Sequence, residues 1–348
     1  MAPDPAGPPS SARSTDLVRQ PVPIGSPVLE SVRAVIGASR FVRTDVVKVV
    51  AHARWMAYEE LPYPGFGLPF GVGASPDEAV DFVLTQNCIN TAFTDFVTGA
   101  KFEVEFAGGR WSDSMAMMAC LKRAMDRGVP VLDGRYLAQL TRSEFERIFD
   151  GTIEMPMLDE KRQVLNEVGR VLAQRYEGFF HNFVATCSPR LYDNGRGLVD
   201  QLVREFPRFD DVSTYHGHEV RFYKLAQLGY WLLHSGLRRR GGFRIDDIAS
   251  MTAFADYIVP AALRVLDVLV YAPDLDARIT EGREIPRDSD EEIEIRAHTL
   301  YATALLTEEI NRLRPPSMQV IIPQVDARLW LNYHTTHWPH HRTRTIMY

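Results

Sequence analysis

The sequence has few cysteines, and none of them lie close together. Its three cysteines, Cys88, Cys120 and Cys187, are widely spaced in a chain of 348 residues. A disulfide framework or a structural zinc site needs cysteines in pairs or in closely spaced sets. We therefore expect a chain that folds in a reducing compartment, with neither disulfides nor a structural metal.

Long apolar runs and an excess of positive charge are also missing. No apolar segment approaches the roughly 18 residues of a membrane span, and the N-terminus has no apolar signal-peptide core. The net charge is −6 and the pI is near 6.0. A general nucleic-acid binder needs a broad basic surface. We therefore expect a cytoplasmic protein with no membrane partner and no stable nucleic-acid partner.

The apolar content is sufficient for one large domain. Hydrophobic residues make up 45% of the chain, and no repeat or linker divides residues 29–348. Residues 1–28 differ, because they are rich in proline, serine, glycine and alanine. Such a segment cannot bury enough apolar surface to become ordered. The sequence therefore predicts a flexible tail over residues 1–28 and a single domain over residues 29–348.

Helical signals dominate this domain. Apolar periodicity, N-cap residues and capping boxes define the predicted helices. They cover residues 29–36, 46–58, 75–93, 115–126, 141–149, 158–176, 198–206, 229–233 and 289–313. Phe102, Val104 and Phe106 alternate with charged residues before Gly108-Gly109, which predicts a hairpin. The predicted fold class is mostly α with small β-hairpins (α+β).

An aspartate in apolar surroundings is the most informative single residue. Asp256 lies between Phe254 and Tyr257, shortly before Pro260. Because proline is tolerated in the first turn of a helix, we expect a short helix from Asp247, a turn at Asp256 and a second helix from Pro260. One interpretation of Asp256 is an N-cap or turn residue. The other is a carboxylate held to face positive charge in a reaction.

Two further candidates also have two interpretations each. Lys224 is the one cation in a largely apolar stretch, and it either extends its amine to water or contacts an anion such as a phosphate. Asn87 and Asn90 lie one helical turn apart beside apolar residues. They either satisfy nearby backbone groups or present their amides to a ligand.

The histidines near the C-terminus suggest a metal site at first sight. They are His334, His337, His340 and His341. No carboxylate or cysteine accompanies them at the spacing that metal ligands need. We therefore expect no metal and no other cofactor.

Several motifs, in order over roughly residues 30–348, resemble the queuosine salvage protein family. They are Phe222-Tyr223-Lys224-Leu225-Ala226-Gln227, residues 249–257 with Pro260, residues 294–297, Asp326 with Leu329-Trp330, and residues 341–344 through Tyr348. The resemblance implies a mostly helical fold similar to the helix-hairpin-helix DNA glycosylases. It also implies hydrolysis of the N-glycosidic bond of queuosine 5′-phosphate, which releases queuine, without a metal.

The resemblance also implies the residues of the site. Asp256 matches the family's catalytic aspartate, which would stabilise the positive charge that builds on the ribose. Lys224, Asp326 and Trp330 match positions in or beside the family's pocket. The chemistry of the reaction adds a hypothesis that Asp326 or Glu294 contacts the exocyclic groups of the leaving base, and a contact of Lys224 with the phosphate is a second hypothesis. The residues expected in or beside the substrate pocket are Lys224, Tyr223, Phe254, Asp326, Trp330, Asn90 and Glu294.

One segment departs from the family's pattern. Where Asn-Phe-x-Phe-Trp is expected, this chain has Asn90-Thr91-Ala92-Phe93-Thr94, so aromatic side chains are missing where a base should stack. An N-glycosidase for a different nucleoside, nucleotide or deazapurine metabolite is therefore one alternative. A non-catalytic nucleotide- or nucleic-acid-binding protein is a second alternative. The acidic charge balance and the retained Asp256 disfavour this second alternative.

Overall fold

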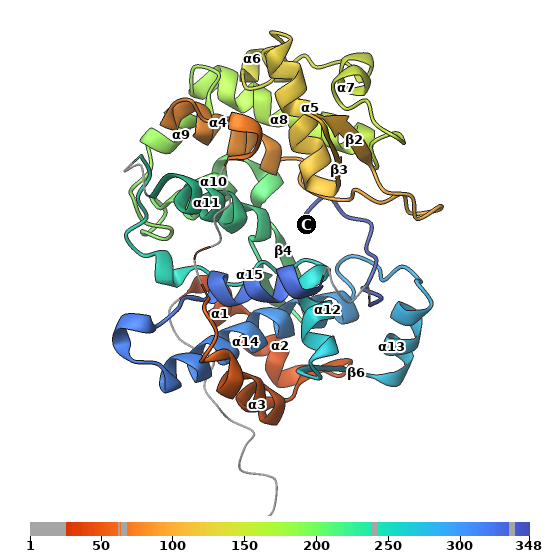
Figure 1. The fold of residues 1–348 in the computed structure, drawn as a ribbon, viewed down its shortest axis with the longest axis vertical. Coiled ribbons are helices and arrows are strands. Elements are labelled where there is room, and N and C mark those ends of the chain that lie inside the picture. The colour runs from red at the N-terminus through yellow and green to blue at the C-terminus, as the bar shows by residue number, and fades with distance from the viewer. Residues whose placement is uncertain (1–25, 62, 64–67, 239–241, 334–337) are drawn as a thin grey trace, which may run out of the picture.

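Helices make up most of the structure, a computed structural model that describes residues 26–61, 63, 68–238, 242–333 and 338–348 (Figure 1). The α-helices are α1 (Pro27–Ser31), α2 (Arg33–Ala38), α3 (Val46–Met56), α4 (Pro76–Asn87), α5 (Asp113–Asp126), α6 (Gly134–Leu137), α7 (Arg142–Ile148), α8 (Leu158–Arg175), α9 (Phe180–Ala185), α10 (Leu198–Glu205), α11 (Lys224–Leu237), α12 (Ile258–Val265), α13 (Pro273–Thr280), α14 (Asp290–Leu313) and α15 (Ile322–Tyr333).

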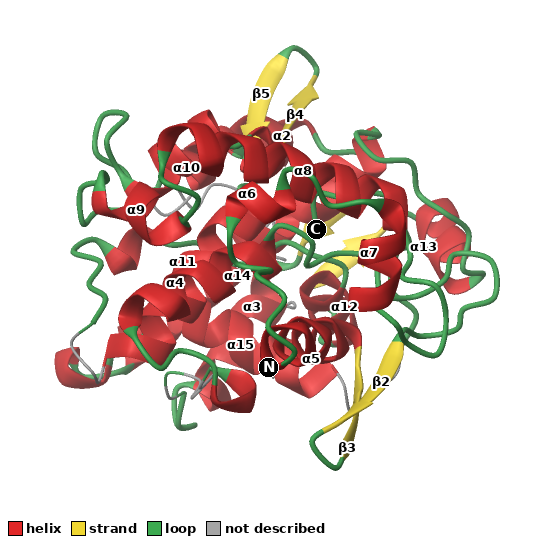
Figure 2. Cartoon of the chain, turned by 90° about the horizontal axis from the view of Figure 1, so that it is seen from above, coloured by secondary structure: helices red, strands yellow, loops and turns green. Residues whose placement is uncertain are grey.

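The strands form small antiparallel pairs. They are β1 (Val42–Thr44) with β6 (Leu269–Tyr271), β2 (Glu103–Phe106) with β3 (Gly109–Ser112), and β4 (Val212–Tyr215) with β5 (His218–Arg221). The β2–β3 and β4–β5 hairpins project from the body of helices in Figure 2. The prediction of a mostly helical α+β fold is confirmed, and β2–β3 is the hairpin expected at Gly108-Gly109.

Two apolar cores organise the helices. One core includes residues of α4, α5, α8 and α11, and the other includes residues of α3, α12, α14 and α15. Figure 1 shows these two groups in the upper and lower parts of the molecule, with the C-terminus between them. Helix α14 belongs to the lower group and is buried along most of its length. Residues distant in the sequence therefore meet where the two groups face each other.

Several helices begin where their capping residues predicted. The Ser75 side chain accepts a hydrogen bond from Glu78 N (3.1 Å) at the start of α4, and Ser289 caps α14 in the same way. Thr141 and Glu144 form the expected capping box of α7. Side-chain oxygens at these positions satisfy backbone N–H groups that have no partner within the helix.

Other boundaries differ from the prediction. Helix α4 ends at Asn87 and does not continue to Phe93, whereas α11 begins at Lys224, earlier than expected. The expected helix near Asp247 is a single 3-10 turn, Ile248–Ser250. Helix α12 begins at Ile258 and includes Pro260 in its first turn, where a missing N–H removes no helical hydrogen bond.

The predicted flexible tail is too long at its C-terminal end. Helix α1 begins at Pro27, and the Ser26 hydroxyl accepts a hydrogen bond from Val28 N (3.3 Å). Val28 is fully buried in the lower core. The remainder of the predicted tail, residues 1–25, lies outside the described residues.

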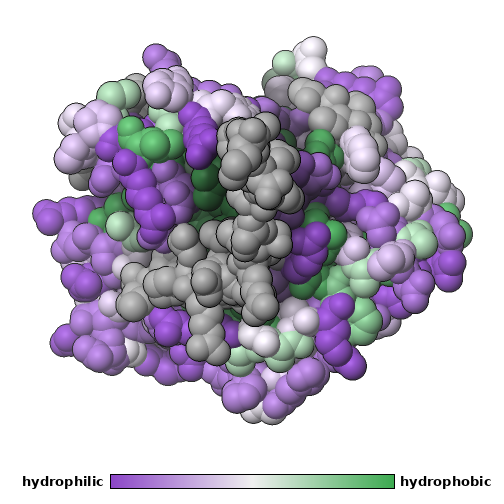
Figure 3. Space-filling model, turned by 90° about the horizontal axis from the view of Figure 1, so that it is seen from below, coloured by the Kyte–Doolittle hydropathy of each residue, from purple (hydrophilic) through white to green (hydrophobic). Residues whose placement is uncertain are grey.

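The molecular surface is mainly polar on the face seen in Figure 3. Among the coloured residues on that face, hydrophilic ones predominate and hydrophobic ones form smaller areas between them. None of the helices in the described part of the chain has the length and apolar character needed to span a membrane.

Candidate active site

A pocket of about 1030 Å³ lies where the two cores meet. Its walls come from α4, α5 and α11 on one side, and from α12, α15 and the C-terminal segment on the other. Of the site residues predicted from the sequence, the pocket is lined by Asn90, Lys224, Phe254, Asp256, Asp326 and Trp330. These residues are far apart in the sequence, so the fold is what brings them together.

Two predicted site residues are not among the lining residues. Tyr223 immediately precedes α11, with a φ of 49°. The Glu294 carboxylate accepts hydrogen bonds from the backbone N–H groups of residues 40–42 and from the Tyr215 hydroxyl (2.8 Å). The side chain of Glu294 thus anchors backbone in the lower core and faces away from the pocket, contrary to the prediction that it contacts the base.

Asp256 lies at the N-terminus of α12 and uses only one of its carboxylate oxygens there. Its Oδ1 accepts hydrogen bonds from Ile258 N (2.7 Å) and Val259 N (3.1 Å). Its Oδ2 makes no hydrogen bond with the described residues, and the side chain lines the pocket. The N-terminal end of a helix dipole favours the ionised carboxylate. The two interpretations of Asp256 are therefore compatible, because one oxygen caps the helix and the other is left for a ligand.

The extended segment that leads to Asp256 is held by side chains from two helices. The Gln227 amide of α11 accepts a hydrogen bond from Thr252 N (2.9 Å) and donates one to the Thr252 hydroxyl (2.9 Å). Asp326 of α15 accepts a hydrogen bond from Phe254 N (2.9 Å). Because alternate residues of the segment are bonded in this way, the backbone before Asp256 has little freedom to move.

A buried ion pair fixes the next residue of the same segment. The Arg296 guanidinium of α14 donates to the Ala255 carbonyl (3.1 Å) and pairs with Asp211 through both of its terminal nitrogens (3.0 and 2.5 Å). Asp211 also accepts a weak bond from the backbone N–H of Lys224 (3.4 Å). One buried pair thus links the backbones that carry Asp256 and Lys224, and sequence reasoning assigned it no role.

Lys224 and Asp326 are the titratable side chains that interact with Asp256 from α11 and α15. Lys224 is only 6% exposed, so its amine does not reach solvent in the way a surface lysine does. Burial lowers the pKa of Lys224, and the charges of Asp256 and Asp326 oppose this effect. Burial raises the pKa of the Asp326 carboxyl well above its ordinary value. This environment favours a neutral Asp326, which can donate a hydrogen bond.

Comparisons with known proteins match the sequence of this chain to one family. Residues 72–348 match the model of the queuosine salvage protein family. The chain belongs to that family. A queuosine 5′-phosphate N-glycosylase/hydrolase of Sphaerobacter thermophilus is 35% identical over 325 residues, which are 92% of this chain and 97% of that protein. A protein of the same name from Mus musculus is 28% identical over 78% of this chain and 82% of its own length. One from Bos taurus is 28% identical over 84% and 86%, respectively.

The segment that departs from the queuosine salvage pattern forms a wall of the pocket. Asn90, Thr91, Phe93 and Thr94 all line it. Asn87 does not, because its amide donates to a backbone carbonyl of α11 (2.6 Å) and its oxygen accepts from Asn90 (3.3 Å). Of the two asparagines, Asn90 is thus the one that borders the space for a ligand.

This queuosine salvage protein also has pocket residues that sequence reasoning did not assign to the site. Tyr257, Tyr333, His340 and Arg342 line the pocket, and the Tyr257 and His340 rings pack with their centroids 4.5 Å apart. Tyr257 and Arg342 belong to motifs that carried the family resemblance. His340 was considered only as a possible metal ligand, so its place in the pocket wall was not predicted.

The described residues contain no cluster of three or more histidine, cysteine, aspartate or glutamate side chains that could hold a metal ion. Two histidines of the C-terminal group, His334 and His337, lie outside the described part of the chain. His341 is buried against Tyr348, and the centroids of the two rings lie 6.2 Å apart. His340 and His341 therefore belong to aromatic packing.

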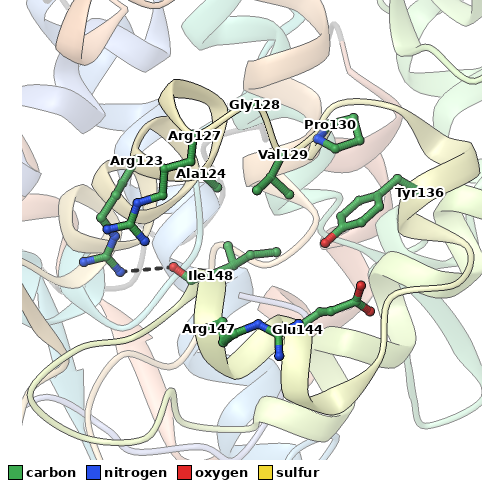
Figure 4. A pocket seen from close by; sticks show the side chains of 10 residues that line it. All are labelled: Arg123, Ala124, Arg127, Gly128, Val129, Pro130, Tyr136, Glu144, Arg147 and Ile148. Carbon is green, nitrogen blue, oxygen red and sulfur yellow. Dashed lines mark hydrogen bonds between the residues drawn. The ribbon is translucent and has the colours of Figure 1, made fainter.

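A second pocket of about 460 Å³ lies between the end of α5 and α7 (Figure 4). Arg123 at its edge donates hydrogen bonds to the carbonyls of Ile148 (3.1 Å) and Asp150 (2.8 Å), and Arg127 and Arg147 are exposed. None of the predicted site residues borders this pocket. The larger pocket is therefore the candidate active site.

Proposed function

We propose that this protein hydrolyses the N-glycosidic bond of queuosine 5′-phosphate and releases queuine. The observation that carries the proposal is the placement of Asp256, whose carboxylate caps α12 with one oxygen and leaves the other for a ligand in the pocket of about 1030 Å³. The relatives named queuosine 5′-phosphate N-glycosylase/hydrolase support this substrate.

Asp256 supplies the charge that the reaction requires. When the bond between C1′ and the base breaks, its electron pair leaves with the base and the ribose becomes oxocarbenium-like. A carboxylate already held in place stabilises this positive charge without reorganising. The free oxygen of Asp256 also accepts a proton from the attacking water, whose oxygen forms the new bond to C1′.

Asp326 and Lys224 assist the departure of the base. The leaving base gains negative charge, which a hydrogen bond or a proton from a neutral carboxyl stabilises. Asp326, whose burial raises its pKa, has this character. Lys224 lies close enough for its positive charge to act on both Asp256 and Asp326. The Lys224 charge acts against the burial that raises the pKa of Asp326, and burial is the larger effect.

Aromatic side chains and one amide provide the binding surface. Phe254 and Trp330 line the same pocket as Asp256 and offer flat apolar faces to a heterocycle. Asn90 borders the pocket with an amide oxygen that can accept a hydrogen bond from a base edge. These residues bind and orient the substrate, and Asp256 carries out the chemistry.

A second candidate substrate is a nucleotide or nucleoside with a different base. The small polar side chains of Thr91 and Thr94 line the pocket where the family pattern has aromatic residues. A pocket wall built from threonines offers hydroxyl groups and more room, and so it favours a base that is larger or more polar at that edge.

Several finer features are part of the same proposal. We infer a single N-glycosidase domain that includes α1 and so begins slightly before the predicted residue 29, with an architecture related to the helix-hairpin-helix DNA glycosylases. The reaction uses no metal and no cofactor, and the enzyme acts on free nucleotides in the cytoplasm, without a stable nucleic-acid partner. The acidic net charge of −6 supports the last point.

The direct test is release of a free base from a panel of substrates. Purified full-length protein is incubated with queuosine 5′-phosphate, queuosine and the common purine nucleosides and 5′-nucleotides, with and without EDTA, and the products are separated by chromatography. The proposal expects queuine from queuosine 5′-phosphate whether or not EDTA is present. Release of a different base would favour the second candidate, and release of no base would contradict both.

A further inference from the structure

A buried lysine lies behind one wall of the candidate active site. Lys161 of α8 is only 1% exposed and forms no ion pair with the residues that the structure describes. Its Nζ donates a hydrogen bond to the Ala92 carbonyl (2.8 Å) and contacts the Met155 sulfur (3.2 Å). The same nitrogen lies 4.7 Å from the centroid of the Phe93 ring. Two of these three contacts are with residues 90–94, the wall segment.

The surroundings of Lys161 favour an uncharged amine. Burial lowers the pKa of Lys161 well below its ordinary value, and the charge of Arg208 lowers it further, whereas Glu160 opposes this change. A neutral amine still donates a hydrogen bond to a carbonyl. Lys161 therefore connects α8 to the wall segment without placing a full charge behind the pocket.

The middle of the wall segment depends on this contact. The segment lies between α4 and β2, and the Phe93 carbonyl accepts a hydrogen bond from Phe102 N (2.8 Å). Ala92 has a φ of 46°, in a region that residues with a side chain seldom adopt. Among the described residues, no group other than Lys161 donates a hydrogen bond to the Ala92 carbonyl. Lys161 thus holds an unfavourable backbone conformation in place.

Phe93 is the one aromatic residue of the wall segment, and its side chain lines the pocket. Thr91 and Thr94 stand where the family pattern has aromatic residues. The segment contains no cation, so it suits an uncharged heterocycle better than a phosphate. A base that stacks on an aromatic ring gains affinity only if the ring is correctly placed. In this chain, stacking at the wall segment therefore depends on how Phe93 is held.

We propose that Lys161 is a positioning residue for base recognition, which holds Phe93 and the wall segment where the base of the substrate stacks. This inference rests on the proposed function, because it concerns the base of the same substrate. Lys161 acts through Phe93 and does not contact the reacting atoms. Asp256 and Asp326 belong to the opposite wall, so loss of Lys161 should affect binding of the base and leave the chemical step largely unchanged.

Separate binding of the two halves of the substrate tests this inference. The affinities of full-length protein for queuine and for ribose 5-phosphate are measured by calorimetry, for wild type, Lys161→Met and the matched control Arg162→Met. Arg162 is the next residue of α8 and bonds to Asn166 (3.0 Å), away from the wall segment. We expect Lys161→Met to bind queuine roughly 5- to 50-fold more weakly and ribose 5-phosphate within about threefold of wild type. Arg162→Met should bind both ligands as wild type does.

Stability distinguishes this role from a purely structural one. Methionine fills a similar space and has no amine to remove from water, so Lys161→Met should melt close to wild type or above it. In turnover of queuosine 5′-phosphate, its KM should rise roughly 5- to 50-fold while kcat stays within about threefold.

A double-mutant cycle tests whether Lys161 acts through Phe93. Phe93→Leu removes the aromatic ring and should itself weaken queuine binding. Addition of Lys161→Met to Phe93→Leu should then change queuine affinity by less than about twofold, because the two changes remove the same contact. Additive losses would show that Lys161 does not act through this ring.

The outcomes separate this inference from the proposed function. If queuine binding depends on Lys161 and Phe93 but queuine is not released from queuosine 5′-phosphate, the proposed reaction is wrong and the positioning role stands. If queuine is released but folded Lys161→Met binds queuine as wild type does, the positioning role is overturned. Equal losses of queuine and ribose 5-phosphate binding, an equal loss in Arg162→Met, or a Lys161→Met protein that does not fold would also overturn it.

Discussion

Asp256 illustrates how one side chain can serve both the fold and the chemistry. Its Oδ1 makes two hydrogen bonds to the first turn of α12, and its Oδ2 is left without a partner among the described residues. A helix cap therefore also orients a reactive group. The sequence alone left these roles as alternatives, because it does not show which oxygen faces which surroundings.

Lys224 should act on the chemistry through charge. Replacing it with the similarly shaped methionine removes the buried cation whose charge acts on Asp256 and Asp326. We expect Lys224→Met to lower kcat by roughly 10- to 100-fold on both queuosine 5′-phosphate and queuosine, because both reactions use the same carboxyl groups beside this cation. Steady-state kinetics on the two substrates measure this directly.

The comparison of the two substrates is what decides the role of Lys224. A loss confined to queuosine 5′-phosphate would instead support the phosphate contact expected from the sequence.

Helix α14 positions the site, although none of its residues lines the pocket. Arg296 on one face holds the Ala255 carbonyl, and Glu294 binds the backbone N–H groups of residues 40–42. The sequence predicted this helix and its cap correctly. It could not show which way Glu294 points, because a glutamate in a buried helix can face either a ligand or a backbone turn.

Removing the charge of Glu294 should therefore affect stability and leave catalysis nearly unchanged. Glu294→Gln places an amide where several backbone donors converge, so we expect a loss of about 2–4 kcal/mol in the free energy of unfolding. Denaturant melts measure this loss, and kcat and KM of the folded fraction should stay within about twofold. The control is Glu308→Gln on the same helix, whose partner Arg312 is half exposed, and this change should cost less than about 1 kcal/mol. A drop in turnover without a loss of stability would show that Glu294 acts in the active site.

The site as a whole could be predicted only in part. Ser75 and Thr141 predicted helix starts, and Gly108-Gly109 predicted a hairpin, because helix capping and turn formation depend on interactions within a few residues. The meeting of residues 90, 224, 256, 326 and 342 depends on how two groups of helices pack, and no local pattern encodes it. The family resemblance supplied most of that set. It did not indicate the Arg296–Asp211 pair, because a buried ion pair has no sequence signal of its own.

The protein should lose stability in mild acid through its buried histidines. Burial lowers the pKa of His298 to about 3 and that of His341 to about 3. The unfolded state binds these protons from pH ~6.5 downward while the folded state does not, so stability is lost as the pH falls from about 7 towards 4. Each histidine should cost up to about 1.4 kcal/mol per pH unit in this range.

Unfolding free energies at pH 7, 6 and 5 check this expectation. His298 bonds to Thr44 (2.9 Å) and Ser39 (3.0 Å), so His298→Asn keeps a polar side chain while it removes one titrating group. The slope of the variant's stability against pH should be smaller by up to about 1.4 kcal/mol per pH unit. Equal slopes for wild type and variant would show that His298 does not titrate as proposed.

The central claim is that Asp256 carries the chemistry, and Asp256→Asn tests it most directly. Asparagine is a good helix cap and keeps an oxygen for Ile258 N and Val259 N, so the melting temperature and ribose 5-phosphate affinity should change little. The variant loses the negative charge opposite the developing oxocarbenium ion, so turnover of queuosine 5′-phosphate should fall at least about 100- to 1000-fold. Turnover within a few-fold of wild type, or a variant that does not fold, would show that Asp256 is only a structural cap.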